Sequence, residues 1–316
     1  MPILGFAVLA TPHASTGREG QGFSTPAETS DYPGLDTILG GFSLAGAQTK
    51  TALRKVGKEW YLPTGREPTT HILKPLLETH PGHYAYNEHF CQTLAGRLGL
   101  FSAESQVGEI GGHTVFISTR YDRFTLPDGT LIRLHQEGTC QALGLHPSQK
   151  YESAGGPGIT SVLQLLNSAK DGQTARKRFM DAVLFNYLVL GTDAHAKNYS
   201  LLYGRGGEFT LAPLYDLSSY LPYVRQRKDR RLAMRIGKDY KDQSILKGNF
   251  ANLCKEGKYP EGLLYQQLHG MTGAIQREIP KLRETLSSQS LWNGTLQKLS
   301  CSLLERVDES VALLDL

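Results

Sequence analysis

The chain has 316 residues, of which 40% are hydrophobic and 20% charged. This composition excludes bulk disorder and allows one large domain or two lobes with a substantial core. The formal net charge of +4 is too small to indicate nucleic-acid binding, although it suits acidic ligands. Four widely spaced cysteines without a C-x-x-C pair disfavour a zinc site or a disulfide framework. No apolar stretch approaches the roughly 18 residues that span a bilayer, and no signal peptide is evident, so we expect a cytoplasmic protein without membrane contact.

Residues 1–137 are expected to form a lobe that is mostly sheet. Residues 11–42 are rich in Gly, Ser, Thr and Pro, which predicts a loop or a poorly ordered arm over residues 1–41. Residues 84–98 have apolar side chains at helical spacing, and Gly99 follows as a typical helix stop. Strands are predicted in the segments FSLAGAQTKTALRKVGKEWYLP, THILKP, TVFISTRYDRF and TLIRLHQE.

Residues 138–316 are expected to be mainly helical. Helical spacing is present in SVLQLLNSA, ARKRFMDAVLFNYLVLG and KLSCSLLERVDESVALL. The segment YSLLYGRGGEFTLAPLYDL contains two apolar runs joined by residues 204–207, with the sequence Gly-Arg-Gly-Gly, which predicts a hairpin. We therefore expect an α+β fold of two lobes that join near residues 136–138.

Three polar residues around this hairpin predict phosphoryl-transfer chemistry. Asp193 and Asn198 lie in GTDAHAKN, directly after a long apolar helix, and Asp216 follows the hairpin. One carboxylate can deprotonate an attacking hydroxyl, while an amide oxygen and a second carboxylate can hold Mg²⁺ on nucleotide phosphates. Each residue alone is also compatible with a helix end or a turn, but their ordered combination favours an active site.

Two further features fit a nucleotide site. Lys74 ends the strand HILK and Glu88 lies in the next helix, an arrangement that points an ammonium at the phosphates, although strand-end lysines are usually solvated. The small-residue turn SLAGAQTK allows backbone N–H groups to approach phosphate oxygens, but it lacks both the G-x-G-x-x-G and the Walker patterns. Its candidate nucleotide contacts are Ser43, Gly46, Ala47, Gln48 and Lys50.

Other polar residues have open roles. His195 is a candidate catalytic residue, a residue that fixes the loop by hydrogen bonding, or an interior structural histidine. Lys197 is a candidate catalytic residue that would neutralise the transferred phosphate, or it holds the loop. The basic run at residues 225–231 is either a solvated loop or a surface for an acidic or nucleic-acid-associated protein partner. The absence of G-x-S-x-G disfavours the commonest hydrolase class.

The ordered motifs resemble the HipA family of bacterial serine/threonine kinases, which are toxins of type II toxin–antitoxin modules associated with growth arrest and persistence. The resemblance runs from about residue 42 to at least residue 235 and is carried by SLAGAQTKTAL, PTTHILKP, NEHFC, CQALGLHPSQKYESAGGPG, GTDAHAKNYS and APLYD. It implies a two-lobed protein-kinase-like fold that uses ATP and Mg²⁺.

The resemblance also implies a role for individual residues. Ser43 matches the loop serine that family members autophosphorylate, an event that disturbs the ATP site. The remaining roles are catalysis by Asp193, Mg²⁺ binding by Asn198 and Asp216, ATP-phosphate binding by Lys74, and adenine contacts from the hinge backbone around Gln136 and Glu137.

The resemblance implies partners as well. The expected substrate is an aminoacyl-tRNA synthetase, and the expected antitoxin is a HipB-like DNA-binding protein that reads DNA in place of this chain. Full-length members carry an additional N-terminal subdomain, whereas 42 residues precede Ser43 here. This length resembles the short HipT-type toxin, for which a small HipS-like protein supplies the missing subdomain.

Two alternative functions use the same residues. The chain could act mainly as a corepressor within an antitoxin–operator complex, with vestigial catalysis. It could also be a small-molecule phosphotransferase, because that class uses the same ATP-binding chemistry, and only the family-specific loops argue against it.

Overall fold

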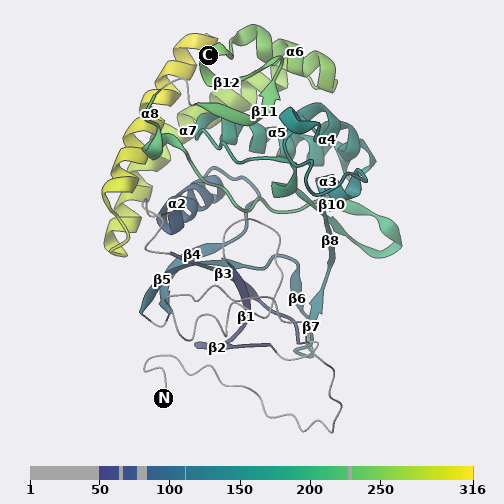
Figure 1. Ribbon diagram of the computed structural model, residues 1–316, viewed down its shortest axis with the longest axis vertical. Helices are drawn as coiled ribbons and strands as arrows, with labels where there is room; N and C mark the ends of the chain where they lie inside the picture. Colours follow the sequence, from purple (N-terminus) through teal and green to yellow (C-terminus); the bar gives the residue numbers. More distant parts are fainter. Residues whose placement is uncertain (1–49, 64–66, 77–83, 111, 227–229, 316) are drawn as a thin grey trace, which may run out of the picture.

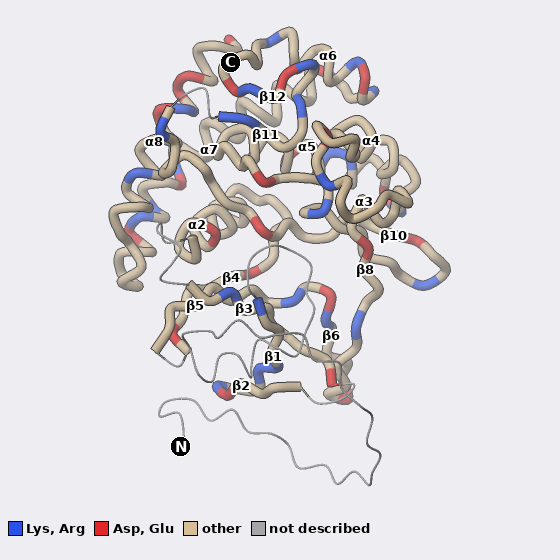
Figure 2. The backbone as a smooth tube through the Cα atoms, viewed as in Figure 1, with Lys and Arg blue, Asp and Glu red and all other residues tan. Residues whose placement is uncertain are grey.

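The computed structural model describes residues 50–63, 67–76, 84–110, 112–226 and 230–315. Figure 1 shows a sheet-containing lobe below a mainly helical lobe, with helix α2 lying between the sheet and the long C-terminal helices. Basic and acidic positions occur in both lobes, as expected from the small net charge (Figure 2). None of the described helices combines the length and apolar character needed to cross a bilayer.

The first lobe is built around a five-stranded antiparallel sheet in the order β2-β1-β3-β5-β4. Its strands are β1 (Thr51–Val56), β2 (Glu59–Tyr61), β3 (His71–Pro75), β4 (Ser105–Ile110) and β5 (His113–Thr119). Side chains alternate between the two faces of a sheet. Pairing of Leu73 with Ile117 therefore places one set of alternate residues in a small apolar core, made of Leu53, Trp60, Leu73, Val115 and Ile117.

Helix α2 (Tyr84–Arg97) packs against β4 and β5 on one side and against the C-terminal helices on the other. Its apolar and polar residues are both buried, because it is enclosed from two directions. Gly99 has φ +78°, a conformation that glycine adopts without steric cost, and this ends the helix near its predicted boundary.

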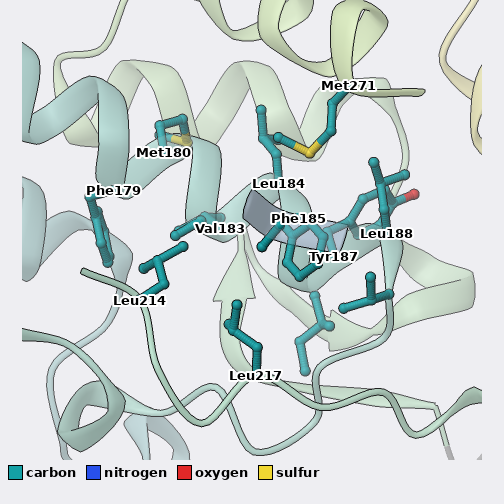
Figure 3. Close-up of a cluster of buried hydrophobic side chains, with 14 of the residues drawn as sticks. Phe179, Met180, Val183, Leu184, Phe185, Tyr187, Leu188, Leu214, Leu217 and Met271 are labelled. Atoms are coloured by element: carbon teal, nitrogen blue, oxygen red, sulfur yellow. The ribbon is translucent and has the colours of Figure 1, made fainter. Parts of the chain in front are cut away.

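The second lobe has a helical core centred on α5 (Gly172–Leu188). The Asp171 side chain accepts a hydrogen bond from the Thr174 N–H and caps the start of this helix. Figure 3 shows the α5 side chains packed with Leu214, Leu217 and Met271. The surrounding helices are α3 (Thr139–Ala142), α4 (Ile159–Leu165), α6 (Lys247–Gly257), α7 (Glu261–Ser288) and α8 (Gly294–Leu314).

Short strands complete the molecule, and several differ from the sequence-based prediction. The predicted hairpin is confirmed as β9 (Ser200–Tyr203) and β10 (Phe209–Leu211). The single strand predicted in TLIRLHQE is wrong, because the chain forms two strands that pair with different partners. These are β7 (Leu131–Arg133), which pairs with β6 (Arg123–Thr125), and β8 (His135–Gly138), which pairs with β9.

The predicted lobe boundary at residues 137 and 138 falls within β8, which belongs to the sheet of the second lobe. A further hairpin of β11 (Arg231–Ile236) and β12 (Asp239–Lys241) was not predicted. The strand predicted before Lys50 lies outside the described residues.

Candidate active site

The predicted catalytic loop leaves α5 through a sharp turn. Leu190 has φ +54°, and the Gly191 N–H donates to the Asn186 carbonyl over 2.8 Å. A Cβ atom at residue 191 would lie 2.2 Å from Asn186 Oδ1, so only glycine fits without displacing that side chain. Because Asn186 also donates to the Tyr199 hydroxyl, this turn is anchored in the core.

Asp193 presents its carboxylate to solvent, with 59% of the side chain exposed. Tyr151 donates its hydroxyl proton to Asp193 Oδ1 over 2.5 Å. The Asp193 carbonyl accepts from the His195 N–H and from Asn198 Nδ2, each over 2.8 Å. The loop thus holds its own backbone in place while leaving the carboxylate accessible.

His195, within the same loop, has a buried side chain. Its Nε2 lies 3.7 Å from Asp193 Oδ1, and its ring packs edge-on against Tyr151 with the ring centres 4.9 Å apart. Burial lowers the pKa of His195, an effect that the nearby Asp193 charge only partly offsets. Its Nδ1 is buried without a hydrogen-bond partner among the described residues. Packing and neutrality favour a structural role for this histidine.

Lys74 is brought to the site by the alternation of β3. Its neighbours at residues 73 and 75 face the other side of the sheet, whereas Lys74 shares the second face with Phe116, its partner on β5. Lys74 Nζ lies 2.7 Å from Glu88 Oε1 and 2.5 Å from Asp216 Oδ1. One ammonium therefore joins residues from a strand, helix α2 and the segment after β10.

The pKa values of these three groups reflect competition between burial and pairing. Burial alone would lower the pKa of Lys74, but the two carboxylates raise it above its usual value. Burial raises the pKa of Glu88 to about 7, and Lys74 offsets only part of this shift. For Asp216, attraction to Lys74 outweighs burial and lowers the pKa. The ammonium and the Asp216 carboxylate are thus both kept charged.

A reciprocal hydrogen-bond pair connects α2 with the segment that carries Asp216. Asn87 Nδ2 donates to the Ser219 carbonyl over 2.7 Å, and the Ser219 N–H donates to Asn87 Oδ1 over 2.8 Å. The Ser219 hydroxyl in turn donates to the Val189 carbonyl at the end of α5. Sequence reasoning missed Asn87, for which the available signal was its place directly before Glu88 in the predicted helix.

A cleft of about 360 Å³ brings most of the predicted residues together. Nine of them line it: Lys50, Lys74, Glu88, Gln136, Asp193, His195, Lys197, Asn198 and Asp216. Burial and the charge of Lys74 lower the pKa of Lys50. The mixture of lysines and carboxylates suits a polyanionic ligand with associated cations.

Other predicted residues are placed differently. Glu137 does not line the cleft, and its carboxylate accepts from the Tyr203 hydroxyl over 2.9 Å. Any nucleotide contact from Glu137 would therefore come from its backbone. Ser43, Gly46, Ala47 and Gln48 lie outside the described residues.

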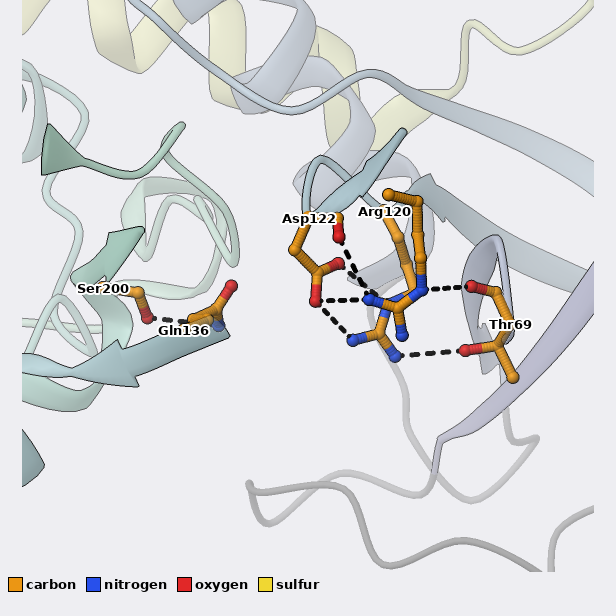
Figure 4. A network of polar contacts seen from close by, with 6 residues as sticks. Thr69, Arg120, Asp122, Gln136 and Ser200 are labelled. Carbon is orange, nitrogen blue, oxygen red and sulfur yellow. Dashed lines mark hydrogen bonds and ion pairs between the residues drawn. The ribbon is translucent and has the colours of Figure 1, made fainter. Parts of the chain in front are cut away.

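A buried charge cluster also borders the cleft and was not predicted. The Asp122 carboxylate accepts from Arg120 and Arg123, and Arg120 also donates to Thr69 (Figure 4). Burial would raise the pKa of Asp122, but the two guanidinium groups lower it. On the opposite side in Figure 4, Gln136 donates to Ser200 over 3.4 Å. These contacts fix the edges of the cleft near the connection between the lobes.

The oxygen atoms of Asn198 and Asp216 fit a magnesium ion. Asn198 uses its Nδ2 to donate to the Asp193 carbonyl, which leaves Oδ1 as the end available to a ligand. Mg²⁺ prefers oxygen and commonly takes one or two protein ligands plus phosphate and water oxygens. The described residues contain no group of three His, Cys, Asp or Glu side chains that could form an all-protein metal site.

A profile of the HipA-like C-terminal domain family matches residues 42–281. The chain belongs to this family. It is 42% identical over 266 residues to the protein named "Putative kinase Y4mE" of Sinorhizobium fredii. It is 30% identical over 251 residues to the serine/threonine-protein kinase toxin HipA of Shewanella oneidensis. These matches cover 84% and 76% of this chain but 62% and 56% of the relatives, so this HipA-family chain spans less than two thirds of either.

The fold also matches a solved structure of a family member. The complex of HipA, HipB and operator DNA from Shewanella oneidensis MR-1 matches with a TM-score of 0.75 and 26% identity. The match covers 87% of this chain and 66% of the matched chain. The predicted HipA resemblance and the two-lobed, protein-kinase-like α+β fold are therefore confirmed.

Proposed function

We propose that the chain is a HipA-type protein kinase that transfers the γ-phosphate of ATP to a serine or threonine hydroxyl of a protein. The observation that carries this proposal is the convergence of Lys74, Asp193 and Asp216 in one cleft. Lys74 and Asp216 are joined by an ion pair, and the Asp193 carboxylate remains largely exposed beside them. The same arrangement of a strand lysine, a loop aspartate and a metal-binding aspartate performs phosphoryl transfer in protein kinases.

Each charged group that lines the cleft has a proposed role in binding ATP or Mg²⁺. Lys74 would bind the α- and β-phosphates, and its hydrogen bond to Glu88 would fix the direction of its ammonium. The backbone of β8 around Gln136 would meet the adenine edge. Mg²⁺, held by Asn198 and Asp216, would neutralise charge on the β- and γ-phosphates.

Asp193 would orient the acceptor and receive its proton. The acceptor hydroxyl transfers its proton to the Asp193 carboxylate as its oxygen forms a bond to the γ-phosphorus. The bond between that phosphorus and the β–γ bridging oxygen breaks, and ADP leaves with the bonding electron pair. The solvent exposure of Asp193 leaves room for a protein acceptor.

We also propose that this activity makes the chain a toxin. Phosphorylation of an aminoacyl-tRNA synthetase would inhibit translation and arrest growth, and autophosphorylation of Ser43 would limit the kinase. A HipB-like antitoxin is the proposed partner, supported by the structural match to a HipA–HipB–operator complex. A small HipS-like protein is proposed as a second partner.

Incubation with γ-labelled ATP, Mg²⁺ and bacterial lysate tests the proposal. Wild-type protein is expected to label itself and at least one lysate protein, and Asp193→Asn is expected to label neither. Asp315→Asn is a matched control, because Asp315 is exposed and remote in the chain from the loop. Failure of wild-type protein to transfer label to any protein would contradict the kinase assignment.

A further inference from the structure

A second hollow, of about 330 Å³, lies beside the catalytic loop. Its lining is mostly polar and comes from four segments of the second lobe. Four hydroxyl-bearing residues precede the β11–β12 hairpin, and the hairpin adds an arginine and a further tyrosine. The polar lining residues are Tyr151, Ser153, Thr192, Tyr220, Arg231 and Tyr240.

Tyr151 places this pocket next to the proposed catalytic aspartate. Its side chain lines the pocket, while its hydroxyl donates to Asp193 Oδ1 over 2.5 Å. Thr192, the residue before Asp193, lines the pocket as well. Asp193 itself lines the larger cleft, so the carboxylate stands between the two hollows. A protein chain that places its hydroxyl at Asp193 is therefore close enough to this pocket to contact it as well.

Arg231 gives the pocket a positive charge. The neighbouring arginines are already paired, since Arg230 contacts Asp242 at 3.4 Å and Arg235 contacts Glu152 at 2.9 Å. No carboxylate in the described ranges forms an ion pair with Arg231, and its guanidinium lies 5.7 Å from the centre of the Tyr240 ring. No acidic residue lines the pocket.

We propose that this pocket anchors the protein acceptor by binding an acidic residue a few positions from the phosphorylated serine or threonine. A guanidinium binds a carboxylate with two parallel hydrogen bonds, and the surrounding hydroxyls can donate further ones. The side chain of one residue, Tyr151, lines the pocket and also contacts Asp193. Because an extended chain advances about 3.3–3.6 Å per residue, the acidic residue would lie a few positions from the acceptor hydroxyl. The inference rests on the kinase function and names its acceptor class.

A positional-scanning peptide library tests this assignment. Each peptide has one central serine and carries Asp, Asn or Lys at a single flanking position, and kcat/KM is measured with ATP and Mg²⁺. In wild-type protein, Asp at one fixed position is expected to exceed Asn by about tenfold. Arg231→Ala should remove this preference, and Arg231→Glu should replace it with a preference for Lys at that position.

Lys238→Glu provides the matched control. It makes the same change of charge in the same hairpin, but Lys238 is exposed and does not line the pocket. The preference for Asp should persist in this variant. Thermal melting of each variant checks that the fold is retained, which is expected because Arg231 is also exposed.

The outcomes separate the two levels of the proposal. Phosphorylation of peptides without an acidic preference, or an unchanged preference in Arg231→Glu, would overturn the acidic subsite and leave the kinase function intact. If wild-type protein labels intact proteins but no peptides, the phosphorylation sites are instead mapped in a dephosphorylated lysate. The residues that flank these sites are then compared between wild type and the Arg231 variants. Absence of any phosphate transfer by wild-type protein would overturn the kinase function and the subsite together.

Discussion

The two halves of the candidate site differ in how far their charged side chains are buried. The Lys74–Glu88–Asp216 group is held by ion pairs of 2.7 and 2.5 Å, and the Lys74 side chain is only 7% exposed. Asp193, in contrast, is 59% exposed and held mainly through its backbone. Under the proposed function, a nucleotide would present the same phosphates in every turnover, so preorganised buried charges would suit it. A protein acceptor would have to enter from solvent, which an exposed Asp193 would allow.

The largest expected effect is the loss of activity in Asp193→Asn. Removing the proposed proton acceptor should lower turnover by roughly 10²–10⁴-fold. The free energy of unfolding should change by less than about 0.5 kcal/mol, because the carboxylate is largely exposed. Single-turnover kinetics and urea unfolding measure the two quantities. A large loss of stability would show that the Asp193 carboxylate also supports the fold.

Lys74→Met should affect both nucleotide binding and stability. It leaves Glu88 and Asp216 close together without their cation, which should cost about 3–5 kcal/mol in the free energy of unfolding. ATP affinity, measured by calorimetry, should fall strongly. Lys58→Met, at an exposed position in the β1–β2 turn, is the control and should change neither. Adding Glu88→Gln to Lys74→Met should recover part of the stability but none of the ATP affinity.

Phosphorylation of Ser43 should weaken ATP binding. A phosphoserine carries about −1.5 to −2 charges near neutral pH, and beside the nucleotide it would repel the ATP phosphates. We expect Ser43→Ala to remain active and to lose self-inactivation during prolonged incubation with ATP. Equal ATP affinities for the phosphorylated and unphosphorylated proteins would contradict this prediction.

Asn87→Ala tests the link between α2 and the Asp216 segment. Loss of the two hydrogen bonds to Ser219 should cost about 1–3 kcal/mol of stability and lower ATP affinity by allowing Glu88 and Asp216 to separate. Gln92→Ala is the comparison variant, because it removes a buried amide of the same helix that donates to the Ala103 carbonyl, in the segment between α2 and β4. If both variants bind ATP equally well, the Asn87 link has no specific role in the site.

The last prediction is a pH dependence of stability that comes from Glu88. An acid whose pKa is raised on folding binds its proton more tightly in the folded state. Its contribution to stability therefore falls as pH rises from an unfolded pKa of about 4.3 to the folded value of about 7. Urea unfolding of wild-type protein and Glu88→Gln across this range should show a difference that grows with pH. A constant difference would mean that Glu88 titrates normally.

The sequence was informative wherever local physics decides the structure. Helix α2 ends at Arg97, two residues before Gly99, and the glycines at 206 and 207 adopt positive φ in the predicted hairpin, because glycine takes this conformation without the steric cost that other residues meet. The order of the motifs also identified the family correctly. The β11–β12 hairpin escaped prediction because its ladder is irregular and pairs only near its ends. TLIRLHQE was predicted as one strand because apolar alternation does not reveal a change of pairing partner.

The assembly of the site depended on contacts between distant residues. Lys74 and Asp216 are separated by 142 positions, Asn87 and Ser219 by 132, and Tyr151 and Asp193 by 42. Residue types and motif order determine which groups are available for phosphoryl transfer. The distances, the burial that shifts their pKa values and the arginine left without an acidic partner arise only in the folded chain, since each depends on which distant side chains the fold brings together.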